Sequence, residues 1–280
     1  MKPRIAIPLP HGGDLEYAER AIPQYERAVE LSGGEPVRIP LDRSPAEVMK
    51  LIERCDAVLL PGSKADVDPA KFGGARHPKT EAADPKRDTV DELLLQDAYN
   101  MRKPVLGICY GLQILNVYRS GTLVQHIESR VNHEAGRKVP VAHEVEIDPG
   151  SKLAEIVWLW GKSVGDASGK GTSSTRAEKL SNDSRALAPE VIPTNSSHHQ
   201  SADSIGDGLK IVARCPEDGI IEALEGTSPD HFVLVVQWHP ERSFEEDEHS
   251  QKIFAALVEA AKEKHRELVG EFETTPRELT

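Results

Sequence analysis

Residues 105–117, VLGICYGLQILNV, decide the fold. The first four predict a buried strand, and residues 112–117 carry apolar side chains at helical spacing. Cys109 lies at the turn between them, flanked by Gly107 and Gly111. Glycines permit such a sharp bend, and the start of the following helix favours a thiolate over a thiol. The pattern G-x-C-x-G is therefore the cysteine counterpart of a serine nucleophile elbow, although this pentapeptide alone also fits a buried structural cysteine.

The chain on the amino-terminal side of this turn alternates short apolar runs with amphipathic stretches. Strands alternating with helices at this spacing predict a parallel sheet that is covered on both faces. The predicted strands are residues 5–7, 36–39 and 57–60, and the predicted helices are residues 16–31, 45–52 and 88–100.

The carboxyl-terminal half has a different pattern. Three segments alternate polar and apolar residues, which predicts antiparallel or edge strands: residues 143–147, 209–212 and 220–224. Residues 232–237 are continuously apolar and are expected to return to the central sheet, before a final helix over residues 250–268. We therefore predict an α/β fold: a single-domain three-layer sandwich with a central, mostly parallel sheet and an additional small antiparallel sheet.

The domain is expected to span residues 1–268, followed by a charged tail at 269–280. Residues 161–186 are rich in Gly, Ser, Ala, Lys and Asp and contain almost no large apolar side chains, so we interpret them as a mobile surface loop inserted in the domain.

Composition excludes several classes of function. The 280 residues include 34 Lys and Arg against 46 Asp and Glu, a net charge of −12, which argues against a nucleic-acid-binding surface. No apolar run approaches the ~18–20 residues that span a bilayer, and the apolar stretch at the amino terminus is too short for a signal peptide. We expect a cytoplasmic protein that acts on a small molecule, with a homodimer as the default assembly.

A thiol nucleophile needs a base, and the base needs an orienting group. His239 follows a buried strand, where its loop begins at the same edge of the sheet as Cys109. Glu241 lies two residues further on, and side chains at i and i+2 of an extended segment point the same way. The other two cysteines, Cys55 and Cys215, are interpreted as small packing residues.

The segments 107–117 and 237–241 resemble the signatures of class I glutamine-amidotransferase-like proteins. Within that superfamily the chain is most similar to the gamma-glutamyl-gamma-aminobutyrate hydrolase family. Further matching segments are residues 60–69, 87–88, 121–125 and 195–200. The matches lie in order along most of residues 3–262, which makes the resemblance specific.

The resemblance implies a cysteine hydrolase of gamma-glutamyl amides, such as gamma-glutamyl-gamma-aminobutyrate, with a gamma-glutamyl thioester intermediate, a role in polyamine catabolism and no cofactor. The implied catalytic triad is Cys109, His239 and Glu241. The implied oxyanion donors are backbone amides of Gly62, Ser63 and Tyr110, and the implied substrate-binding residues are Gln113, His198 and Gln200. Tyr110 replaces the arginine frequent in the family, and it and the 161–186 loop are expected to border the pocket and influence substrate choice.

Three alternatives were weighed against this hypothesis. A metal site could draw on His133, His143, His198, His199 and His239, but none shows H-x-x-x-H spacing with a carboxylate or a C-x-x-C pair, so no metal is predicted. A glutaminase subunit serving a synthetase would share the triad, yet no synthetase domain follows and residues 198–200 resemble the stand-alone hydrolases. A non-catalytic binding protein on the same scaffold is disfavoured by the intact triad.

Overall fold

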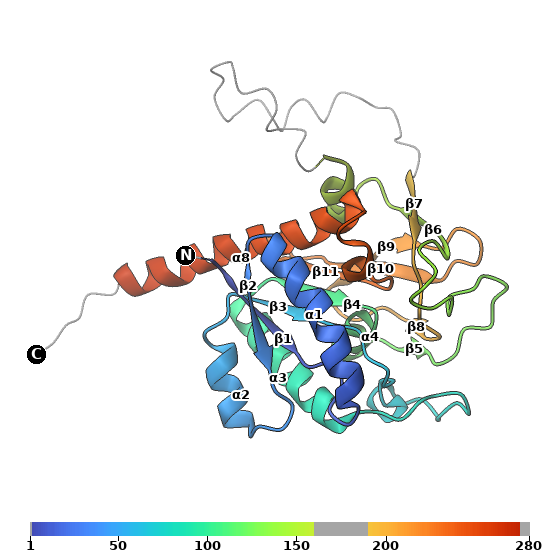
Figure 1. Cartoon of the computed structure of the whole chain (residues 1–280), viewed down its shortest axis with the longest axis horizontal. Coiled ribbons are helices and arrows are strands. Elements are labelled where there is room, and N and C mark those ends of the chain that lie inside the picture. The colour runs from blue at the N-terminus through green and yellow to red at the C-terminus, as the bar shows by residue number, and fades with distance from the viewer. Residues whose placement is uncertain (1, 160–189, 275–280) are drawn as a thin grey trace, which may run out of the picture.

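The computed structural model describes residues 2–159 and 190–274, so the predicted 161–186 loop lies outside the described residues. One nine-stranded sheet runs through the molecule in the order β2-β1-β3-β4-β11-β10-β9-β6-β7 (Figure 1). Its strands are β1 (Arg4–Pro8), β2 (Glu35–Ile39), β3 (Ala57–Leu60), β4 (Val105–Ile108), β6 (His143–Ile147), β7 (Glu190–Thr194), β9 (Leu209–Arg214), β10 (Ile221–Gly226) and β11 (Val233–Val236). A separate two-stranded antiparallel sheet pairs β5 (Leu123–Val124) with β8 (Ser201–Ala202).

The sheet is mixed, with its two directions segregated. Strands β2, β1, β3, β4 and β11 are parallel to one another. From β11 onward, β10, β9, β6 and β7 add antiparallel. The α/β class, the return of the 232–237 segment to the centre and the small antiparallel sheet are confirmed. The alternating carboxyl-terminal strands were predicted as antiparallel, and they extend the main sheet instead of forming a sheet of their own.

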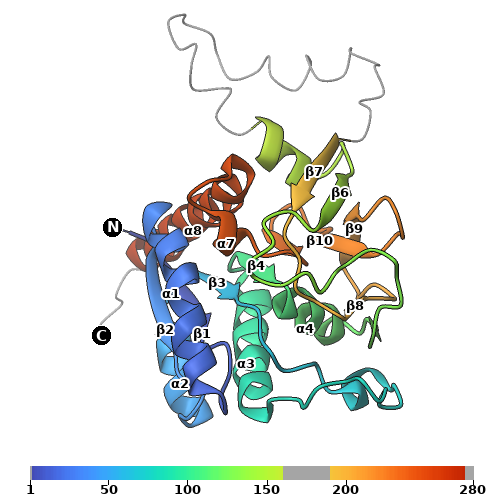
Figure 2. The ribbon, with the colours of Figure 1, turned by 45° about the vertical axis from the view of Figure 1, so that its right-hand side comes forward.

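Helices cover both faces, so the structure has three layers (Figure 2). The larger helices are α1 (Leu15–Leu31), α2 (Pro45–Ile52), α3 (Pro85–Met101), α4 (Tyr110–Tyr118) and α8 (Glu248–Thr274), and the short ones are η1 (Pro69–Phe72), α5 (Lys152–Ala154), η2 (Glu155–Leu159) and α7 (Pro240–Ser243). Apolar residues of α1 and α8 pack on one face, and those of α2, α3 and α4 pack on the other. Strands β3, β4 and β11 are buried at every position, which explains their unbroken apolar sequences.

Local signals set most helix boundaries. Ser44 precedes α2, Pro45 occupies its first position, and Glu47 accepts a hydrogen bond from the Ser44 amide at 3.0 Å. The final helix does not end near Leu268 as predicted but continues to Thr274. None of the helices within the described ranges combines the length and apolar character needed to cross a bilayer.

Candidate active site

Cys109 occupies a strained turn between β4 and α4. Its backbone has φ 54° and ψ −104°, a region that costs a non-glycine residue about 1–3 kcal/mol. The flanking glycines are required by close packing. A methyl group on Gly111 would lie 2.3 Å from the Leu60 carbonyl oxygen, and one on Gly107 would lie 2.7 Å from Val235 Cγ1. The G-x-C-x-G pattern thus lets β4 and α4 approach β3 and β11 at the bend.

The parallel strands bring the predicted nucleophile and base together. Because β3, β4 and β11 are neighbours and parallel, Gly62, Cys109 and His239 follow them at one edge of the sheet. A methyl group on Gly62 would lie 3.0 Å from His239 Cε1 and 3.6 Å from Cys109 Cβ. The thiol and the imidazole therefore border the same small space.

His239 is held in one orientation. Its Nδ1 lies 2.8 Å from Glu241 Oε1, and both side chains are buried. Asn195 fixes the backbone of this histidine, because its side chain both donates to the His239 carbonyl and accepts from the His239 amide. The remaining ring nitrogen, Nε2, is buried without a hydrogen-bond partner among the described residues. It is the free nitrogen that a general base requires.

Burial dominates the protonation of both groups. Desolvation raises the pKa of Cys109 to about 12, against smaller lowering effects of Arg242 and of the Tyr110 amide. The helix start was expected to favour a thiolate, and burial, which favours the thiol, is the larger effect on Cys109. Burial also lowers the pKa of His239 below its usual value, against the raising effect of Glu241. A neutral imidazole thus faces a neutral thiol.

A pocket of about 620 Å³ opens at this edge of the sheet. Cys109 and His239 line it, together with the predicted substrate-binding residues Gln113, His198 and Gln200. Its charged lining residues are Arg20, Lys64, Lys79, Arg137, Arg242, Asp66, Glu81 and Glu134.

Several predicted roles are altered by the geometry. The Gly62 amide donates to the Tyr25 hydroxyl at 3.1 Å, so this predicted oxyanion donor already has an acceptor. Tyr110 does not border the pocket as expected. Its hydroxyl donates to Asp88 at 2.7 Å, and its side chain is buried against α3. Both ring nitrogens of His198 face protein groups: Nδ1 lies 2.9 Å from the Gln200 carbonyl oxygen, and Nε2 lies 3.6 Å from Glu222 Oε1.

Two arginines with contacts at this site were assigned no role from the sequence. Arg242 lies directly after Glu241, lines the pocket and donates to Ser197 Oγ at 2.7 Å. Arg87, on α3, is fully buried and holds both oxygens of Asp91 at 2.8 Å. It also donates to the Pro61 carbonyl at 2.9 Å, immediately before Gly62. The only sequence signal for Arg87 was its place in a matching segment.

Arg87 is expected to be important for stability. Replacing it with methionine leaves the Asp91 carboxylate buried and unpaired, which costs about 3–5 kcal/mol in the free energy of unfolding. The double variant Arg87→Met/Asp91→Leu removes both charges and should recover most of that loss. Urea denaturation of the three proteins measures both effects, and a single variant as stable as wild type would show that the pair contributes nothing.

Comparison with known proteins agrees with this geometry. The model of the peptidase C26 family matches residues 11–241. The chain belongs to this family. It is 34% identical over 241 residues to a candidate glutamine amidotransferase of Mycobacterium tuberculosis, covering 85% of this chain and 66% of that protein. It is 28% identical over 249 residues to the gamma-glutamyl-gamma-aminobutyrate hydrolase PuuD of Escherichia coli, covering 85% and 84%.

A solved structure shows the same fold. A candidate GMP synthase component from Thermoplasma acidophilum superposes with a TM-score of 0.60 at 13% identity, covering 96% of this chain and 98% of that one. The family model and the sequence relatives confirm the resemblance drawn from residues 107–117 and 237–241. This member of the peptidase C26 family is a glutamine-amidotransferase-like hydrolase.

Proposed function

We propose that this peptidase C26 member hydrolyses the gamma-glutamyl amide bond of small gamma-glutamyl amines, with Cys109, His239 and Glu241 as its triad. The observation that carries the proposal is a buried His239 Nε2, which has no hydrogen-bond partner in the part of the chain that the structure describes, next to a cysteine at a strained turn. Nucleophile, base and orienting carboxylate then stand in the order that acyl transfer requires.

The reaction proceeds in two halves. Cys109 transfers its proton to His239 Nε2 as Sγ attacks the amide carbonyl carbon. The tetrahedral intermediate collapses, the C–N bond breaks, and His239 returns that proton to the departing amine. Water then attacks the gamma-glutamyl thioester, His239 takes a proton from it, and collapse restores the thiol and releases glutamate. Glu241 stabilises the imidazolium formed in each half.

Backbone amides of Tyr110 and Ser63 are the proposed oxyanion donors. Tyr110 is the first residue of α4 and follows Cys109 directly, so its amide lies beside the thiol. The Gly62 amide is engaged by Tyr25, so we assign Gly62 a steric role instead: only a glycine leaves the space between Cys109 and His239 open.

The charge distribution fits an anionic substrate. The chain as a whole carries a net charge of −12, yet five cationic side chains line the pocket against three acidic ones. Lys64 pairs with Asp14, and Arg242 Nε lies 3.5 Å from Glu241 Oε1. Arg20, Lys79 and Arg137 are therefore the cationic lining residues that we propose attract a carboxylate in spite of the overall charge. We propose that these side chains bind the alpha-carboxylate of the glutamyl group, with the side-chain amides of Gln113 and Gln200 nearby.

A hydrolysis screen tests the proposal. The purified chain is incubated with gamma-glutamyl amides whose leaving groups are gamma-aminobutyrate, a diamine, an amino acid, an aromatic amine or ammonia. We expect release of glutamate and amine in equal amounts from at least one amide, without a second protein. Glutamine cleavage that needs an added synthetase, with no turnover of the other amides, would instead support the role of a glutaminase that serves a synthetase.

The pH profile of kcat/KM should reflect the buried imidazole. His239 acts as base only when neutral, and burial lowers its pKa below the usual 6.5. The base form therefore persists as the pH falls through 6.5, and the acidic half-maximum of kcat/KM is expected below that value. Circular dichroism over the same pH range separates titration from unfolding. A half-maximum above 6.5 in folded protein would contradict the assignment.

A further inference from the structure

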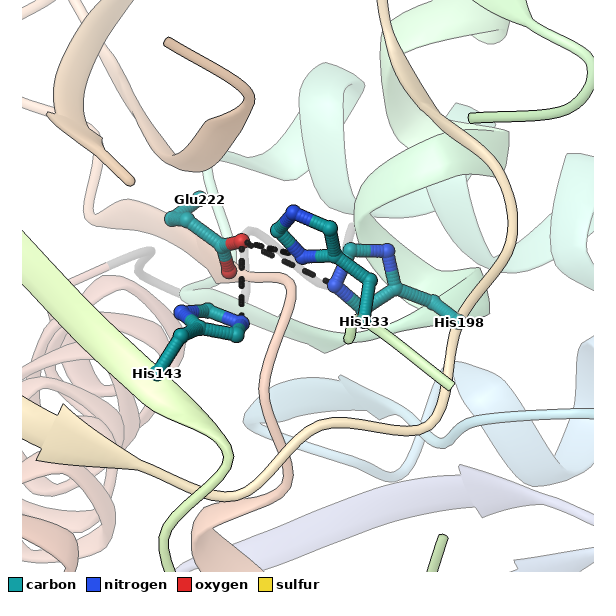
Figure 3. A group of neighbouring side chains, drawn as sticks. All are labelled: His133, His143, His198 and Glu222. Atoms are coloured by element: carbon teal, nitrogen blue, oxygen red, sulfur yellow. Dashed lines mark ion pairs between the residues drawn. The ribbon is translucent and has the colours of Figure 1, made fainter. Parts of the chain in front are cut away.

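Three histidines and one glutamate converge behind the pocket wall (Figure 3). His133 lies in the loop after β5, His143 begins β6, His198 lies between β7 and β8, and Glu222 lies on β10. All four side chains are buried. The proposed hydrolysis uses no ring nitrogen of His133, His143 or His198, and it does not use Glu222.

The distances from Glu222 to the three ring nitrogens are close to those between the ligands of a tetrahedral metal site. Glu222 Oε1 lies 3.4 Å from His133 Nδ1, 3.5 Å from His143 Nε2 and 3.6 Å from His198 Nε2. These separations are long for hydrogen bonds. Ligand atoms at about 2.0–2.1 Å from a tetrahedral zinc ion are about 3.3–3.4 Å apart. The three separations from Glu222 are close to that value, and all four candidate ligand atoms lie within 4.8 Å of one another.

Outer hydrogen bonds fix which nitrogen of each ring faces the cluster. His143 Nδ1 lies 3.1 Å from the Glu144 carbonyl oxygen, and His198 Nδ1 lies 2.9 Å from that of Gln200. A carbonyl oxygen only accepts, so each Nδ1 carries the hydrogen and each Nε2 presents a lone pair. This outer contact is the one that metal-binding histidines make in nearly all proteins.

His133 is oriented in the same manner through its other nitrogen. Its Nε2 lies 2.8 Å from Asp218 Oδ2, and Asp218 also accepts hydrogen bonds from Ser129 Oγ and the Ile220 amide. In a neutral ring Nε2 donates to this carboxylate, and Nδ1 of His133 then carries the lone pair that faces Glu222.

The result is an arrangement that needs a cation. Three lone pairs and one carboxylate face one another, and neither these three nitrogens nor the two oxygens of Glu222 have a hydrogen-bond partner among the described residues. Buried polar atoms without partners are costly. One protonated imidazole would pair with Glu222 and leave the other two lone pairs unsatisfied, whereas one divalent ion satisfies the three nitrogens and Glu222 Oε1.

We propose that His133 Nδ1, His143 Nε2, His198 Nε2 and Glu222 Oε1 bind one zinc ion. Imidazole and carboxylate are ligands that zinc accepts, and four protein ligands in a closed tetrahedron are typical of a structural site. The sequence predicted no metal because the ligands come from four separated segments. Three of the five histidines considered for a metal site nevertheless meet here.

The ion would brace the wall of the active-site pocket. The His133 carbonyl accepts hydrogen bonds from Ser196 Oγ and the His198 amide, and the Gly136 amide donates to the Ser196 carbonyl. Gly136 and His198 line the pocket that contains Cys109. A bound zinc would thus join two loops of that wall to strands β6 and β10.

Metal content tests the proposal independently of any hydrolytic activity. The full untagged chain is produced with added zinc, dialysed against chelator-treated buffer and analysed by mass spectrometry of its metals. We expect about one zinc per chain, with X-ray absorption showing nitrogen and oxygen neighbours at about 2.0–2.1 Å. Protein that binds no zinc even after incubation with zinc salts would overturn the proposal. So would a sulfur neighbour at about 2.3 Å, because Cys215 forms an overlapping set with His133 and Asp218.

Variants identify the ligands. Glu222→Gln should lower bound zinc at least about tenfold, while Cys215→Ser and His249→Gln, which leave the four ligands intact, should retain it. Equal zinc in Glu222→Gln and wild type would contradict the site. Should Glu222→Gln fail to fold, wild type stripped with a strong chelator replaces it: its Tm should fall and recover with zinc but not with magnesium, and an unchanged Tm would contradict a structural ion.

Discussion

Replacing Cys109 with serine is expected to lower kcat/KM for gamma-glutamyl amides by at least about 10⁴-fold, with the fold retained. A serine hydroxyl is far less acidic and less nucleophilic than a thiol, and the buried site penalises its ionised form further. The strained backbone conformation at φ 54° costs serine and cysteine about the same free energy, and the two side chains differ by one atom. Initial rates at several substrate concentrations measure the loss, and thermal melting verifies folding.

The matched control is Cys55→Ser. Cys55 is buried and its thiol donates to the Leu51 carbonyl, which a hydroxyl can also do. We expect kcat/KM within about twofold of wild type, since surface and core changes away from a site rarely alter chemistry. A mass shift from the trapped thioester should disappear in Cys109→Ser and persist in Cys55→Ser. Turnover by Cys109→Ser near the wild-type rate would contradict the nucleophile assignment.

Local chemistry made the nucleophile and its base predictable. The turn around Cys109 needs two glycines within five residues, and the hydrogen bond between His239 and Glu241 joins residues only two positions apart. The parallel order of β3, β4 and β11 follows from continuously apolar segments, and it brings both motifs to one edge of the sheet. Motifs of this kind carry their geometry in their spacing.

Contacts between distant segments could not be predicted in this way. Tyr25 and Gly62 are 37 residues apart, so nothing in the 60–69 segment indicates that the Gly62 amide is engaged. The effect of burial on the Cys109 thiol could not be predicted for a related reason: the helix start is visible in the sequence, while the depth of burial depends on the whole fold. The residues of the histidine–glutamate cluster come from four separated segments, so no short motif in the sequence indicates it.

Glu241→Gln is the second change with a large expected effect. Glu241 accepts from His239 Nδ1 at 2.8 Å and is itself buried, so its negative charge acts on the imidazolium with little screening. A glutamine has nearly the same shape but carries no charge and can present its NH₂ group to Nδ1, which favours the wrong tautomer. In a serine protease triad, the equivalent change lowers kcat about 10⁴-fold. We expect a loss of about 10²–10⁴ here, with KM nearly unchanged.

The control for Glu241→Gln is Glu245→Gln, the same charge removal four residues further along the chain. Glu245 is exposed and pairs with Arg27, so kcat should stay within about twofold of wild type. Glu241→Gln also removes the negative charge that lies 3.5 Å from Arg242 Nε. The positive charge of Arg242 then further lowers the pKa of the His239 imidazole, so the residual activity of Glu241→Gln should extend to still lower pH. A loss of less than about tenfold would mean that Asn195 and burial alone orient His239, and that Glu241 is not part of the triad.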